Sequence, residues 1–213
     1  MHALDPRSRA VAIGLASIAG MVDAIGFMAS GGFFLSFMSG NSTRLAVGIY
    51  DIAPYVGMVA ALLLSFVGGV TIGSLIGRRN GHRPETRRVM ILFLMAGLLF
   101  LAPLLGGRGL LLPALCMAAF CMGAENTLFE RDGTVSFGLT YMTGALVKIG
   151  QGVATMLNGG ERLAWLPFLL LWIGLLTGAI IGAASFAGLG LFALWIPAAM
   201  ALIFGGMTWL WAS

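Results

Sequence analysis

The chain alternates long apolar stretches with short polar or glycine-rich joints along nearly its whole length. About 20 consecutive apolar residues are enough to cross the hydrocarbon core of a bilayer as a helix. Six stretches reach roughly that length, so each predicts a membrane-spanning helix. The expected spans are residues 10–29, 55–77, 89–106, 109–128, 163–185 and 190–211.

Two further segments, residues 38–50 and 142–158, do not fit this pattern because polar residues and glycines interrupt them. The first is also far too short to span a bilayer. We predict that each is a re-entrant or broken half-helix. Ser39 and Thr143 are the expected N-caps, because a hydroxyl accepts a hydrogen bond from the free N–H groups of a first helical turn.

The chain carries the same pattern twice. FMSGNSTRLAVGI at 37–49 and YMTGALVKIGQGV at 141–153 share an aromatic residue, Met, Ser or Thr, and Gly, followed by a cation and a second Gly at equal spacing. Two glycine stripes also match, Gly69, Gly73 and Gly77 with Gly174, Gly178 and Gly182. We therefore predict two repeats in one membrane domain, residues 1–107 and 108–213.

Composition excludes a water-soluble protein. Charged residues are 9% and hydrophobic residues 59% of the chain, whereas a soluble domain has about 25% charged residues. The net charge of +4 gathers in the N-terminal tail and at 78–88, as in cytoplasmic loops, and predicts no nucleic-acid partner. We expect a multi-pass membrane protein with both termini in the cytoplasm. Asp23 in the first span argues against a cleaved signal peptide there.

Three spans per repeat is an odd number, so the two repeats run in opposite directions through the membrane. Four spans per repeat would make them parallel, but would place the Arg-rich loop opposite the Arg-bearing tail, against the positive-inside rule. The predicted fold is therefore an all-α integral membrane protein. It has six transmembrane helices and two half-helices in an inverted 3+3 repeat.

Two acidic residues lie in apolar surroundings, Asp23 in AGMVDAIGF and Glu125, followed by Asn126, in CMGAENTLF. A carboxylate inside a bilayer is costly unless it is paired, protonated or hydrated, and such residues often mark a solute or ion path. A purely structural role is the alternative. Arg44 and Lys148 sit at matching places in the half-helices. They either pair with Asp23 and Glu125 or extend to the headgroups.

The starts of the half-helices are the candidate solute site. A helix N-terminus carries a partial positive charge and unpaired N–H donors, and two such ends meeting near the midplane would bind a small polar or anionic solute. Tight turns with internally satisfied caps are the alternative. The candidate residues are Ser39, Gly40, Asn41, Thr43, Thr140, Thr143 and Gly144.

No catalytic or metal-binding pattern is present in the sequence, so we predict no enzyme, no metal and no cofactor. Cys116 and Cys121 are expected to be small core residues. The glycine stripes predict close helix packing, either between the two halves or across the face of a homodimer.

The motifs at 20–27, 37–41, 122–126 and 140–144 together resemble the YoaK family of bacterial membrane proteins (DUF1275) over nearly the whole chain. The resemblance implies a multi-span inner-membrane protein with no assigned biochemical function. Family members usually have Gln where this chain has Glu125, and a polar residue where it has Ala145. Glu125 thus adds a titratable group, and Ala145 leaves the first repeat as the more polar binding half.

These features predict a small secondary transporter or channel for a small polar or anionic solute in the lipid bilayer. Asp23 and Glu125 would carry protons or balance charge. The alternative is a membrane protein that does not transport, such as a scaffold, a sensor or a partner subunit. Convergence of the polar residues of both repeats on one cavity would favour transport.

Overall fold

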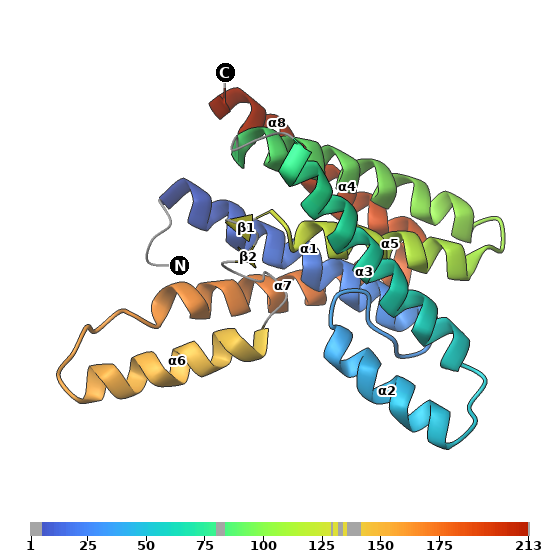
Figure 1. Cartoon of the computed structure of the whole chain (residues 1–213), viewed down its shortest axis with the longest axis horizontal. Helices are drawn as coiled ribbons and strands as arrows, with labels where there is room; N and C mark the ends of the chain where they lie inside the picture. The colour runs from blue at the N-terminus through green and yellow to red at the C-terminus, as the bar shows by residue number, and fades with distance from the viewer. Residues whose placement is uncertain (1–5, 80–83, 129, 132–133, 136–141, 213) are drawn as a thin grey trace.

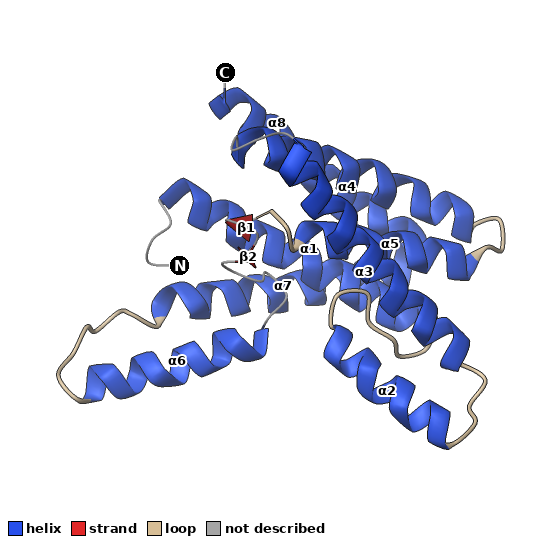
Figure 2. Cartoon of the chain, viewed as in Figure 1, coloured by secondary structure: helices blue, strands red, loops and turns tan. Residues whose placement is uncertain are grey.

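The structure is a computed structural model that describes residues 6–79, 84–128, 130–131, 134–135 and 142–212. The described chain is almost entirely helical, with one short two-stranded antiparallel ladder (Figure 2). Its elements are α1 (Pro6–Ser30), α2 (Met38–Tyr50), α3 (Val56–Arg79), α4 (Pro84–Gly106), α5 (Leu111–Glu125), β1 (Glu130–Arg131), β2 (Thr134–Val135), α6 (Met142–Leu157), α7 (Leu166–Leu189), η1 (Gly190–Leu194) and α8 (Trp195–Ala212).

The helices α1, α3, α4, α5, α7 and α8 form the bundle in Figure 1. The most extensive contacts join α1 to α7, α3 to α5, and α4 to both α8 and α5. A continuous apolar core, rich in alanine and leucine, runs between these helices. Small side chains let the helices approach closely, which is how membrane helices gain packing energy when lipid is as apolar as the core.

The glycine stripes lie at the closest helix contacts. Gly178 of α7 lies against the backbone of Ser17 in α1, and Gly69 of α3 lies against that of Phe120 in α5. A Cβ atom at either glycine would overlap the facing carbonyl, so only glycine fits there. Both stripes therefore pack helices of one chain against each other and are not free to form a dimer face. A homodimer through another face stays a prediction.

The short helices α2 and α6 stand apart from the bundle. Each packs mainly on the helix that follows it, α2 on α3 and α6 on α7. Figure 1 shows that both begin near the middle of the molecule and point away from each other, α2 to the lower right and α6 to the lower left. The predicted boundaries, 38–50 and 142–158, agree with these two helices to within one residue.

The bundle differs from the prediction in two places. By length and composition, the described chain has four candidate membrane spans, Arg9–Ser30, Val56–Arg79, Glu85–Gly106 and Leu166–Leu210. The fourth stretch contains both α7 and α8, because the apolar η1 joins them without a polar loop. Six separate spans thus stay a prediction.

The second difference is α5, which ends at Glu125 and is 15 residues long instead of covering 109–128. The chain leaves the helix through turns in which the N–H of Thr127 donates to Ala124 and that of Leu128 to Glu125. Residues 126–128, Asn-Thr-Leu, are buried in these turns and do not form a further helical turn.

Large apolar side chains are exposed on many helices, for example Leu64, which is 72% exposed, and Ile180, which is 61% exposed. So many exposed apolar side chains are unfavourable in water but match the acyl chains of a bilayer. Together with the candidate spans, this makes the chain a multi-pass membrane protein.

Candidate functional site

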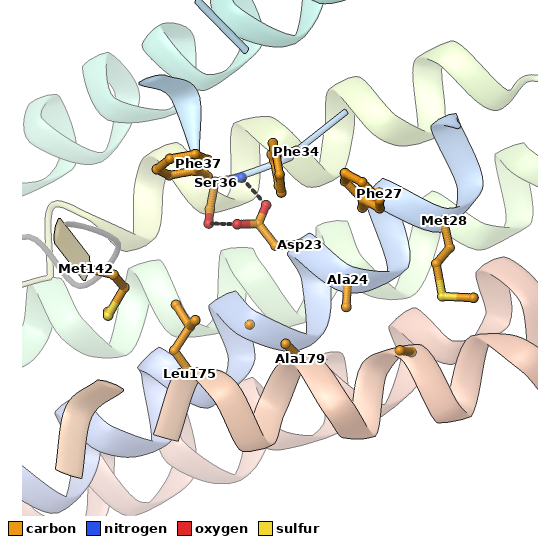
Figure 3. A pocket seen from close by; sticks show the side chains of 12 residues that line it. Asp23, Ala24, Phe27, Met28, Phe34, Ser36, Phe37, Met142, Leu175 and Ala179 are labelled. Atoms are coloured by element: carbon orange, nitrogen blue, oxygen red, sulfur yellow. Dashed lines mark hydrogen bonds between the residues drawn. The ribbon is translucent and has the colours of Figure 1, made fainter. Parts of the chain in front are cut away.

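A cavity of about 410 Å³ lies between α1, the 31–37 loop and α7 (Figure 3). Phe37, just before α2, and Met142, the first residue of α6, both line it, so the starts of the two short helices meet at this cavity. Its wall is apolar apart from Asp23 and Ser36. The lining residues are Gly20, Asp23, Ala24, Phe27, Met28, Phe34, Ser36, Phe37, Met142, Leu175, Ala179 and Ala183.

Asp23 projects from α1 toward the loop that precedes α2. Its Oδ1 accepts hydrogen bonds from the backbone N–H groups of Leu35, at 2.7 Å, and Ser36, at 2.6 Å. Its Oδ2 accepts a third bond from the Ser36 hydroxyl, at 2.6 Å. Figure 3 shows both bonds to Ser36. These three donors are the kind of environment that stabilises an ionised carboxylate.

Asn41, fully buried in the first turns of α2, holds the same loop from the other side. Its amide nitrogen donates to the carbonyl of Phe34 at 2.7 Å, and its side-chain oxygen accepts from the N–H of Phe34 at 3.0 Å. The loop backbone is therefore fixed between α1 and α2. Asp23 and Asn41 supply the partners that loop N–H groups need away from water.

The loop turns back at two glycines with left-handed backbone angles, Gly31 at φ +75° and Gly32 at φ +118°. The Ser30 hydroxyl closes the turn, since it both donates to the carbonyl of Phe33 and accepts from its N–H. This turn brings 34–37 back to the level of Asp23.

The predicted ion pairs do not form. Arg44 lies over the ring of Phe33, with its guanidinium carbon 5.0 Å from the ring centroid, and has no ion pair with Asp23. Lys148 is exposed and is not paired with Glu125. The physical reason is that backbone amides and a hydroxyl already satisfy Asp23, while Arg44 finds an aromatic face.

The hydroxyls at the helix starts also differ from the prediction. α2 begins at Met38 with Phe37 as its N-cap and no side-chain cap bond, so Ser39 lies in the exposed first turn. Gly40 packs against the ring of Phe37, and Thr43 donates back to the carbonyl of Ser39.

In α6, Thr143 and Gly144 lie in the exposed first turn, so Thr143 is inside the helix and not its N-cap. Thr140 lies outside the described residues. Of the predicted hydroxyl and glycine positions that the structure describes at the two helix starts, none lines the cavity.

Glu125 is the last residue of α5 and is fully buried. Within the described part of the chain, neither of its carboxyl oxygens has a hydrogen-bond partner. The neighbouring Asn126 donates to the carbonyl of Met122 at 2.9 Å. α1, which carries Asp23, also packs on α5, which ends at Glu125.

Comparison with known proteins places the chain in a family. Residues 11–207 match the family described as "Protein of unknown function (DUF1275)". The chain belongs to this family. It is similar to the UPF0700 transmembrane protein RA0705 of Rhizobium meliloti (strain 1021), with 36% identity over 197 residues that cover 91% of this chain and 83% of that protein.

It is also similar to the UPF0700 transmembrane protein YoaK of Bacillus subtilis (strain 168). The identity there is 27% over 203 residues, which cover 89% of this chain and 88% of that protein. No solved structure matches the chain. The family expected from the motifs is thus confirmed, and with it a transmembrane protein.

In this DUF1275 chain, the sequence did not indicate several residues that make the cavity. Ser36 and the aromatic residues Phe27, Phe34 and Phe37 were not candidates. One signal was available for Ser36, since it is the one polar residue in the run FFLSFM at 33–38. Met142 belongs to the repeated motif but was not a candidate, and the α7 residues carried no signal, because only the fold brings them to Asp23.

Proposed function

We propose that this protein is a small transporter of the bacterial inner membrane, and that its solute binds in the cavity beside Asp23. One observation carries the proposal, namely that the starts of α2 and α6, about 100 residues apart in the chain, line the same cavity. Half-helices that start at a shared central site are a recurring design of transporters.

The helix lengths support six spans with two half-helices. At 1.5 Å per residue, the 13 residues of α2 cover about 20 Å, more than half of a ~30 Å hydrocarbon core but less than all of it. The 24 residues of α7 cover about 36 Å, enough to span alone, which leaves α8 as a separate span. α5 would end inside the membrane, where Glu125 lies.

The orientation follows from charge. The basic last turn of α3 lies at the same end of the bundle as the first turns of α1 and the end of α8 (Figure 1). The positive-inside rule then places both termini and the 78–88 region in the cytoplasm.

Repeated contacts support an inverted repeat. If residues 108–213 repeat 1–107, then α1 corresponds to α5 and α3 to α7, and the two strongly packed pairs α1–α7 and α5–α3 are one contact made twice. The closest backbone contacts agree with this correspondence between the helices. Gly20 of α1 lies against the backbone of Leu175 in α7, and Gly123 of α5 lies against that of Phe66 in α3.

The same contacts show which glycine of the α3 stripe corresponds to which glycine of the α7 stripe. Since Gly20 corresponds to Gly123, the Ser17 that faces Gly178 corresponds to the Phe120 that faces Gly69. Gly69 therefore pairs with Gly178, one helical turn beyond the match read from the sequence.

By the same alignment, Asp23 corresponds to Asn126, and Glu125 corresponds to Val22. The two acids are thus not equivalent positions of the repeats. In the second repeat, the position that corresponds to Asp23 holds the amide Asn126. The negative charge of Asp23 therefore has no counterpart in the second repeat.

The residues that line the cavity restrict the class of solute that it can bind. Its volume of about 410 Å³ is in the usual range for small-molecule sites. Its lining is apolar except for Asp23 and Ser36, and the carboxylate of Asp23 disfavours an anion. We therefore propose a small, largely apolar solute with a hydrogen-bond donor or a positive charge, in place of the anionic solute expected from the helix starts.

The test is a ligand screen on purified protein. Small amines with apolar bodies should raise the melting temperature, and matched carboxylic acids should not. A ligand at 100 times its Kd contributes about 2.7 kcal/mol, or a shift of about 5–10 °C for a chain of this size. Asp23→Asn should abolish the shift, and Asp51→Asn, at an exposed loop position, should keep it. Binding unaffected by Asp23→Asn would contradict the proposal.

A specific observation favours the second candidate, a membrane scaffold that does not transport. Asp23 and Asn41 make internal hydrogen bonds that hold the 31–37 loop in place. This structural role does not require a solute. Vesicle flux separates the two. Uptake of a solute that binds, lost in Asp23→Asn and kept in Asp51→Asn, requires transport, whereas binding without flux indicates a scaffold or sensor.

A further inference from the structure

Glu125 is an exception among the acidic side chains whose surroundings the structure describes. It is 0% exposed, and both carboxyl oxygens lack a hydrogen-bond partner among the described residues. By contrast, Asp23 accepts three hydrogen bonds. A buried ionised carboxylate without partners is very costly, and such a group takes up a proton instead.

Within the part of the chain that the structure describes, no cation is hydrogen-bonded to Glu125, and this includes Arg87 and Arg88 of α4. α5 packs on α1, α3 and α4. From α1, which packs on α5, the acid is Asp23, and a carboxylate there would disfavour a second negative charge. From α4, Arg87 donates to the carbonyl of Leu128. From α3, Arg78 and Arg79 lie in the exposed last turn.

On its own helix, Glu125 has only Cys121 as a titratable neighbour, and that thiol is buried. A calcium ion in place of the proton would need several oxygen ligands, carboxylates among them, around the carboxyl group. The described residues contain no cluster of three or more His, Cys, Asp or Glu that could hold a metal ion.

We infer that Glu125 is a proton-binding site inside the helix bundle, and that it holds its proton at neutral pH in the conformation described. Two nearby carboxyl groups in contrasting environments take different protonation states, so Asp23 is the charged member and Glu125 the neutral one. This inference goes beyond the proposed transport and does not depend on it. If the protein transports, opening of α5 toward water is the step that would release the proton.

The direct test is infrared difference spectroscopy of purified protein in lipid at pH 7. The spectrum of the wild type minus that of Glu125→Gln should contain the carbonyl band of a protonated carboxylic acid, shifted in ²H₂O. The matched difference for Asp23→Asn should contain carboxylate bands instead. Carboxylate bands in the Glu125 difference, or a band that responds to Na⁺ at constant pH, would overturn the inference.

A second measurement covers the case in which Glu125→Gln fails to fold. The chain has four glutamates, Glu85, Glu125, Glu130 and Glu161. In wild-type protein labelled with ¹³C at the glutamate side-chain carboxyls, one of four resonances should keep the chemical shift of a protonated acid at pH 7. Four resonances of ionised carboxylates would contradict the inference without any variant.

Discussion

Removal of the Asp23 carboxylate tests whether its hydrogen bonds hold the 31–37 loop against α1. In Asp23→Ala, the N–H groups of Leu35 and Ser36 and the Ser36 hydroxyl lose their acceptor. A buried donor left without a partner costs about 1–3 kcal/mol. Partial hydration of the loop lowers the sum, so we expect a loss of about 3–6 kcal/mol in the free energy of unfolding.

Asp23→Asn is the matched variant. Its side-chain oxygen can accept from both N–H groups, and its amide nitrogen can donate to the Ser36 hydroxyl oxygen. The geometry is retained and only the charge is lost, so the expected cost is about 1 kcal/mol. At about 2–4 °C per kcal/mol for a chain of this length, Asp23→Ala should melt about 6–24 °C lower than the wild type, and Asp23→Asn only a few degrees lower.

The assay is thermal unfolding of detergent-purified protein followed by intrinsic fluorescence. Asp51→Ala serves as the control, because Asp51 is exposed and its side chain has no hydrogen bond shown in the structure. The reasoning is refuted if Asp23→Ala melts together with Asp23→Asn, since the three hydrogen bonds would then contribute nothing to stability.

Three further predictions concern packing, the turn and the buried acid. Gly178→Ala should lower the melting temperature by several degrees in the same assay, because the added Cβ meets helix backbone. Gly97→Ala should be neutral or stabilising, since nothing lies within 4 Å of a Cβ there. Equal effects of the two substitutions would count against the close contact at Gly178. Gly32→Ala should lower the melting temperature, because φ is +118° and the added Cβ lies 3.1 Å from the Arg44 guanidinium, and an unchanged value would exclude strain there. As the pH rises, the melting temperature of the wild type should fall more than that of Glu125→Gln, because ionisation of Glu125 places an unpaired charge in the core or opens the fold. Melting temperatures that change in parallel from about pH 6 to 10 would argue against a protonated Glu125.

Apolar length and repeated motifs were sufficient to predict the helical membrane architecture and the positions of α2 and α6. The end of α5 was placed too late because the predicted span ran on through the polar residues Asn126 and Thr127, which are buried and whose side chains donate to carbonyls of the last helical turn. Likewise, α7 and α8 follow each other without a polar loop, so composition alone does not divide them.

The site was only partly predictable for a different reason. Asp23 and Asn41 were identifiable as polar residues in apolar surroundings, and both do lie beside the cavity or its loop. Their partners are backbone groups, which leave no mark in a sequence. The pairing of Asp23 with Arg44 was a reasonable expectation from charge, but amide donors at 2.6–2.7 Å satisfy the carboxylate first.

The central claim is that the starts of α2 and α6 meet while their far ends diverge. It is tested most directly by bis-maleimide cross-linking in native membranes, with Cys116→Ser and Cys121→Ala as the background. Phe37→Cys with Met142→Cys should cross-link rapidly through a short linker, because both residues line one cavity. Tyr50→Cys with Leu157→Cys, at the far ends of the two helices, should not react within one chain (Figure 1). Cross-linking of the second pair but not the first would contradict the account.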